Sequence, residues 1–190
     1  AVYAGAQYWL GRVFERLQDS PRALFSYEAA LSGQQAGALE RDAAMAAARL
    51  YLRRDEAARA YAIMSNSVVA AGDDAPMEVL AVMGQSALAH GAHAEARRVL
   101  AAALQRGTNS ELQAYVACTL GAAELVSGAE TSAWQRLAAL SAPPAPPLVQ
   151  AMARYYRGHA AIARGATNEA RAVLLASVTN VLSTPLDVPP

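Results

Sequence analysis

Histidine and cysteine are the side chains of this 190-residue chain whose chemistry could be metal-binding or catalytic. His90 and His93 stand three residues apart, which on a continuous helix would place both imidazoles on one face. Zinc needs three or four ligands, however, and no nearby cysteine or pair of carboxylates completes such a set. Gly91 also interrupts the helix between them. We therefore interpret both histidines as solvated turn residues and predict no metal site.

Cys118 is the only cysteine, which excludes an internal disulfide and any multi-cysteine metal site. A reactive thiol needs a neighbouring group that lowers its pKa, and no histidine lies close to Cys118 in the local pattern. We therefore interpret it as a small apolar residue of a helix. The sequence contains no paired catalytic carboxylates, nucleophile elbow or glycine-rich phosphate loop. We expect no enzyme activity in these residues and no cofactor.

Charge is balanced, which argues against nucleic acid as a partner. The 16 basic residues are all arginine, and 16 acidic residues oppose them. Arg53-Arg54 and Arg97-Arg98 are short basic pairs on solvated faces rather than a block that could follow a phosphate backbone. The sequence has no apolar run long enough to span a bilayer, so we expect a soluble protein, cytoplasmic or periplasmic, without membrane insertion. The start at Ala1, without a methionine, suggests a processed protein or part of a longer one.

A repeat of small residues predicts the secondary-structure elements that would position such side chains. Alanines recur every 34 to 39 positions, roughly, and a glycine stands twelve residues before four of them. A large residue follows each alanine after four positions. The alanines are Ala23, Ala57, Ala96, Ala133 and Ala170; the glycines are Gly11, Gly84, Gly121 and Gly158; the large residues are Tyr27, Tyr61, Leu100, Leu137 and Leu174. This alternation predicts repeated helix pairs.

Turn signals between glycine and alanine, and proline or glycine between the pairs, divide the chain into ten expected helices. They span about 2–17, 20–33, 38–52, 55–71, 75–90, 92–106, 110–127, 129–141, 147–164 and 166–182. We expect Ser20, followed by Pro21, to cap its helix, and Asp55 and Thr167 to cap theirs. The three prolines in 183–190 predict a linker or tail there.

The pattern resembles the tetratricopeptide repeat. The first unit carries the resemblance best, with Tyr8-Trp9-Leu10-Gly11-Arg12-Val13-Phe14 in its first helix and Ala23, Tyr27 and Ala30 in its second. Met45 in place of the glycine, Glu124 at the aromatic position and Leu140 at the last alanine are departures. The resemblance implies an all-α, right-handed α-solenoid of stacked antiparallel helix pairs over 1–182, with units at about 4–37, 38–72, 75–109, 110–146 and 147–182.

Helix packing explains the same alternation of small and large residues. The glycine and alanine let the two backbones of a pair approach where they cross, and we expect the large residue to fill the space against the next pair. One pair cannot bury its apolar face alone, so neighbouring pairs must stack. Apolar residues near both ends, Tyr3 and Trp9 at one and Val178, Val181 and Leu182 at the other, suggest that more chain or another subunit covers these ends.

In the family that the chain resembles, the first helix of each pair lines a concave groove. The resemblance implies the following groove residues: Tyr8 and Arg12, Asp42 and Arg49, Ala81 and Gln85, Cys118 and Ala122, and Tyr155 and His159. Family members that clamp a C-terminal carboxylate use lysines, and this chain has none. Such a clamp is therefore disfavoured, and we expect an extended segment or a helix held by side-chain contacts.

The favoured function is a non-catalytic protein–protein interaction scaffold that binds a protein or peptide segment, as part of a larger protein or a multiprotein complex. Two alternatives stay open. One is a regulatory or substrate-presenting domain of a larger enzyme. The other is a chaperone or assembly factor for secreted or envelope proteins.

Overall fold

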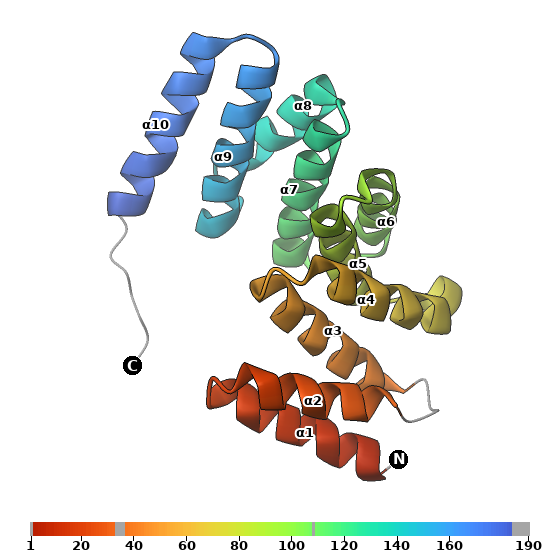
Figure 1. The fold of residues 1–190 in the computed structure, drawn as a ribbon. Coiled ribbons are helices and arrows are strands. Elements are labelled where there is room, and N and C mark those ends of the chain that lie inside the picture. The colour runs from red at the N-terminus through yellow and green to blue at the C-terminus, as the bar shows by residue number, and fades with distance from the viewer. Residues whose placement is uncertain (1, 33–36, 108, 184–190) are drawn as a thin grey trace. The chain divides into compact units, whose positions relative to one another are not determined.

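The chain folds into consecutive antiparallel helix pairs (Figure 1), which a computed structural model describes over residues 2–32, 37–107 and 109–183. The described residues form ten α-helices and one short 3-10 turn, η1. The helices are α1 (Val2–Arg16), α2 (Ser20–Leu31), α3 (Ala38–Arg53), α4 (Ala57–Ala71), α5 (Met77–His90), α6 (His93–Arg106), α7 (Ser110–Val126), α8 (Glu130–Leu140), α9 (Pro147–Ala163) and α10 (Thr167–Ser183), with η1 at Gly72–Asp74. Each predicted helix is confirmed, and its ends differ from the prediction by two residues at most.

The predicted helix caps are wrong, each by one position. Asp19 rather than Ser20 caps α2, and its Oδ1 accepts a hydrogen bond from the Arg22 backbone N–H at 3.2 Å. Asp55 lies in the preceding turn with a φ of 61°, so that Glu56 takes the N-cap position of α4. Thr167 is already the first residue of α10. The sequence pattern located the turns. It did not show at which residue each turn ends, so each predicted cap is displaced along the chain.

The turn inside each pair has the same backbone geometry. In each, one residue adopts a left-handed conformation, and the next N–H donates to the carbonyl five residues earlier, as in the Schellman motif. The left-handed residues are Gln18, Asp55, Gly91, Gly128 and Gly165, and the bonds join Asp19 to Phe14, Glu56 to Tyr51, Ala92 to Ala87, Ala129 to Glu124 and Ala166 to Ala161 at 2.8–2.9 Å. Glycine is thus replaced by an ordinary residue in the first two turns.

Residues Ala1–Val99 form one compact unit. In it α1 pairs with α2 and α3 with α4, while α3 also packs against α1 and α2, and α5 packs against α3 and α4. The core is made of residues with little or no exposed surface, among them Tyr27, Ala47, Leu50, Met64 and Val79. The first helices α1, α3 and α5 are therefore neighbours, and side chains of two of them can meet.

Residues Leu100–Pro190 form a second unit, so the boundary falls inside α6. Here α7 pairs with α8 and α9 with α10, and α9 also packs against α7 and α8. Its core contains Cys118, Ala133, Leu137, Val149 and Ala153. The predicted single array over 1–182 stays a prediction. Residues 184–190 and the side chains of Val178, Val181 and Leu182 lie outside what the structure describes.

The recurring glycines lie beneath the large residue of their own pair. A Cβ on Gly11 would be 2.6 Å from ring carbons of Tyr27, and one on Gly121 would be 2.8 Å from Leu137 Cδ2. Gly158 has the same relation to Leu174. The large residue was expected to fill the space against the next pair. In these three pairs it covers the glycine, because glycine leaves room for a full side chain where the helices cross. Leu137 also shares a core cluster with Val149 and Ala153 of α9, in the next pair, as expected.

Glu124, the departure in the fourth unit, is a buried carboxylate that pairs with a partly exposed arginine. Its side chain is 6% exposed, and both of its oxygens accept hydrogen bonds from Arg136, at 3.0 Å from Nε and 2.8 Å from Nη2. This bidentate pairing satisfies the carboxylate that burial would otherwise destabilise. The pair α7–α8 therefore holds together with an ion pair where an aromatic residue was expected.

One face of α1 is exposed, although the equivalent face of α3 is buried. Trp9 is 60% and Val13 52% exposed, whereas Ala43 and Ala47, which stand 34 residues later in the repeat, have no exposed surface. Tyr3 is 66% exposed as well. The small residues of α3 let it pack closely on α2.

Candidate functional site

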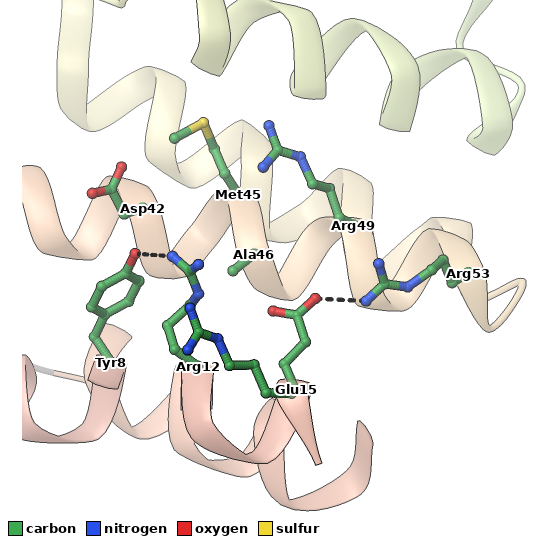
Figure 2. A pocket seen from close by; sticks show the side chains of 9 residues that line it. Tyr8, Arg12, Glu15, Asp42, Met45, Ala46, Arg49 and Arg53 are labelled. Carbon is green, nitrogen blue, oxygen red and sulfur yellow. Dashed lines mark hydrogen bonds and ion pairs between the residues drawn. The ribbon is translucent and has the colours of Figure 1, made fainter. Parts of the chain in front are cut away.

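Six charged side chains line an open depression of about 600 Å³ between α1 and α3 (Figure 2). The two helices supply side chains that repeat at three- and four-residue intervals, so that each set occupies one helical face. The lining residues are Tyr8, Arg12, Glu15 and Arg16 from α1, and Asp42, Met45, Ala46, Arg49 and Arg53 from α3. Four of the ten groove residues that the resemblance implied, Tyr8, Arg12, Asp42 and Arg49, therefore lie together.

Glu15 links the depression to the core below it. Its Oε1 accepts a hydrogen bond from Arg53 Nη2 at 2.7 Å, and its Oε2 accepts one from the Tyr27 hydroxyl at 2.9 Å. Partial burial raises the pKa of Glu15, but the hydrogen bonds from Arg53 and Tyr27 outweigh that effect and hold the pKa below its ordinary value. Glu15 is therefore ionised at neutral pH, and both of its oxygens have partners within the chain.

Tyr8 contributes its hydroxyl group, rather than its ring, to the depression. The residue is only 6% exposed, and its ring packs against Tyr27 with the centroids 6.1 Å apart. The hydroxyl accepts a hydrogen bond from Arg12 Nη1 at 3.0 Å. This bond orients the exposed Arg12 guanidinium along the depression and leaves its other N–H groups available, because a guanidinium carries five donors. Tyr8 is thus a positioning residue for Arg12.

The remaining charges of the depression are unpaired. Within the described residues, Arg16 and Arg49 make no hydrogen bond or ion pair through their side chains, and both are exposed. Asp42 makes none there either. Figure 2 shows Asp42 beside Tyr8 at one end, while Arg49 and Arg53 extend toward the other. The depression therefore has the Asp42 carboxylate at one end, the Glu15–Arg53 ion pair toward the other, and Arg16 and Arg49 without a carboxylate partner among the described residues.

The second unit brings two other predicted residues together. Tyr155 and His159 lie one turn apart on α9, with ring centroids 4.6 Å apart and an edge-to-face angle of 64°. Tyr155 is 51% exposed, and His159 is exposed too. These two rings form a small aromatic surface on α9.

Three of the positions that the resemblance implied do not reach a groove. Cys118 has no exposed surface and lies in the core of the second unit, while Ala81 and Ala122 are 5% and 2% exposed. Burial raises the pKa of Cys118 to about 12, so the thiol stays protonated at neutral pH. The expectation that Cys118 contacts a partner is therefore wrong, because α9 packs over that face of α7. Gln85 is half-buried on α5.

The two turn histidines differ in their surroundings. His90 is exposed and stacks on Tyr61 with ring centroids 4.8 Å apart. His93 begins α6, and its Nδ1 is buried without a hydrogen-bond partner among the described residues, so it is not the fully solvated residue expected. In the described part of the chain no three His, Cys, Asp or Glu side chains gather closely enough to hold a metal ion.

Sequence reasoning missed Glu15, Arg16 and Arg53. Their signal was present in the helical spacing, since Arg16 follows Arg12 by four residues and Arg53 follows Arg49 by four. Spacing alone does not show how far α1 rotates toward α3, and that rotation decides which neighbours enter the depression.

Comparison with known proteins bears on the fold. Neither a protein-family model nor a curated protein matches the sequence. Solved structures do match: YrrB, described as a TPR protein with an unusual peptide-binding site, is 17% identical over 91% of this chain and 84% of its own, with a TM-score of 0.66. The chain has the tetratricopeptide-repeat fold. Two further proteins agree with this assignment.

MamA is 16% identical over 99% of this chain and 98% of its own, with a TM-score of 0.71. The TPR-like repeats of a putative kinesin light chain from Podosopora anserina are 14% identical over 95% and 96%, also with a TM-score of 0.71. The predicted tetratricopeptide-type α-solenoid of helix pairs is confirmed. No helix among the described residues is both long enough and apolar enough to cross a membrane.

Proposed function

We propose that this tetratricopeptide-repeat chain is a non-catalytic interaction scaffold that binds a segment of a partner protein in the α1–α3 depression. One observation carries the proposal: the first helices of two consecutive pairs jointly expose charged side chains, Arg16, Asp42 and Arg49, that have no partner among the described residues. Exposed arginine is among the residues that most often anchor protein interfaces. A depression of about 600 Å³ is also large enough to hold several residues of an extended segment.

The chemistry of the site favours binding over catalysis. Glu15 is satisfied by Arg53 and Tyr27, so it is not poised as a base. The one thiol is buried and protonated. YrrB, which shares the fold, is described as having a peptide-binding site, and the same kind of ligand suits the open shape of this depression.

Site-specific photo-cross-linking tests the proposal. A benzoyl-phenylalanine in place of Met45 would lie in the depression without removing a charge. The matched control carries it in place of Val69, which is 81% exposed on α4 and lies outside the depression. We expect Met45 to cross-link one recurring protein segment in the native extract, and a synthetic peptide of that segment to compete with it.

Equal cross-linking of the same proteins at Met45 and Val69 would show nonspecific adhesion and overturn the proposal. Absence of any cross-link at Met45, with the chain folded and the reagent active, would overturn it as well.

A further inference from the structure

We infer that the α1–α3 depression selects an acidic segment in which aspartate or glutamate stands at alternate positions of an extended backbone. This inference deepens the proposed scaffold function and rests on it. The chemistry that recognises the segment is arginine–carboxylate pairing.

The charges of the depression support an anionic ligand. Arg12, Arg16, Arg49 and Arg53 line it, opposed by Glu15 and Asp42. Glu15 is already occupied by Arg53 at 2.7 Å. Arg12 donates to a neutral hydroxyl, and Arg16 and Arg49 have no carboxylate partner among the described residues. Three guanidinium groups are therefore available to carboxylates of a ligand.

Arginine also suits this role by its geometry. Its planar guanidinium can bind a carboxylate through two parallel N–H bonds, which a lysine ammonium cannot do. The chain contains no lysine at all. The bond from Tyr8 holds Arg12 in place before a ligand arrives, which reduces the entropy lost on binding.

The spacing of the arginines points to alternate acidic residues. Arg12 and Arg16 are one helical turn apart, and four residues of an α-helix rise about 6 Å. In an extended segment, side chains two positions apart lie on the same side and are separated by about 6.6 Å. Two such carboxylates can therefore reach Arg12 and Arg16 together, with Arg49 on the opposite wall.

Asp42 makes the two ends of the depression differ in charge. It lies at the Tyr8 end, away from Arg49 and Arg53 (Figure 2), and its carboxylate has no partner among the described residues. An acidic side chain placed beside it would be repelled. The acidic residues of the segment therefore lie toward Arg16 and Arg49.

The test uses a fluorescein-labelled peptide of alternating serine and glutamate, Ser-Glu-Ser-Glu-Ser-Glu-Ser, titrated with the full chain at low salt and followed by fluorescence anisotropy. One control peptide has glutamine in place of glutamate. A second has the same number of glutamates at every third position, which puts neighbouring carboxylates on opposite sides of an extended backbone. We expect the alternating acidic peptide to bind at least fivefold more tightly than either control, and added salt to weaken it.

Three variants report on the site. Arg49→Gln should weaken binding of the acidic peptide by about three- to tenfold. Asp42→Asn should strengthen it, because it removes the repelling carboxylate. Arg41→Gln is the matched control, since Arg41 lies on the same helix but does not line the depression, and it should leave binding unchanged. Circular dichroism checks that each variant is folded.

Equal binding of acidic and glutamine peptides, or equal effects of Arg49→Gln and Arg41→Gln, would overturn the acidic assignment. So would tighter binding of a short single-stranded oligonucleotide than of the acidic peptide, or no binding of the acidic peptide at all. None of these results removes the scaffold function, which the cross-linking at Met45 tests separately: a cross-linked segment without acidic residues would keep the scaffold and reject its charge preference.

Discussion

Adding one methyl group to Gly11 tests the packing of the first helix pair. In Gly11→Ala the new Cβ would lie 2.6 Å from Cδ1 and Cε1 of Tyr27, well inside van der Waals contact. Tyr27 has no exposed surface, and its hydroxyl is bonded to Glu15 at 2.9 Å. The ring cannot move away without straining that bond and the core around it.

The expected cost follows from two opposing effects. Overpacking a core site costs about 1–3 kcal/mol, while alanine gains about 1 kcal/mol over glycine inside a helix. We expect a net loss of up to about 2 kcal/mol in the free energy of unfolding. Gly5→Ala is the matched control in the same helix: its Cβ would meet only Leu39 Cδ1, at 3.4 Å. That variant should be neutral or gain up to about 1 kcal/mol.

Urea unfolding followed by circular dichroism measures both free energies under the same conditions. The two substitutions should have opposite signs, or differ by more than 1 kcal/mol, roughly, in the stated direction. If Gly11→Ala is as stable as Gly5→Ala, Tyr27 does not lie over Gly11, and the register of small and large residues is wrong.

Three further predictions follow from single residues. Gln18→Gly should stabilise the chain by up to about 1 kcal/mol, measured by urea unfolding, because Gln18 holds a φ of 58° that glycine adopts without strain; a clear loss would contradict this. Glu15 has a depressed pKa in the folded chain, so its stabilisation is present above the unfolded pKa and is lost as pH falls through the folded value; Glu15→Gln should flatten that acid limb of a stability–pH curve, and an unchanged limb would refute the assignment. Cys118 should resist a thiol reagent at neutral pH in the native chain and react after unfolding, as read by mass spectrometry; fast native labelling would show that it is accessible.

The helices could be predicted well from the sequence because glycine and proline mark turns and helix ends. Gly91, Gly128 and Gly165 adopt the left-handed conformation that glycine favours, and proline begins α9. The caps were harder to predict. Gln18 and Asp55 take the same left-handed position without being glycine, so composition gave no sign of the residue at which each turn ends.

The candidate site could be predicted only in part. Tyr8, Arg12, Asp42 and Arg49 were found from the resemblance, because consecutive first helices of this fold lie side by side. Arg16 and Arg53 were missed, since the rotation of α1 against α3 decides their position.

Cys118 was placed wrongly for a related reason. Small apolar residues are compatible with either an open groove or a closely packed helix contact, and the packing of α9 on α7 decides between the two.

The most direct test of the account is a structure of the chain bound to the segment that cross-linking at Met45 identifies. We expect the segment to lie extended between α1 and α3, with acidic side chains on Arg12, Arg16 or Arg49. A segment bound elsewhere, on the outer faces of α2 and α4 or on the Tyr155–His159 surface, would contradict it.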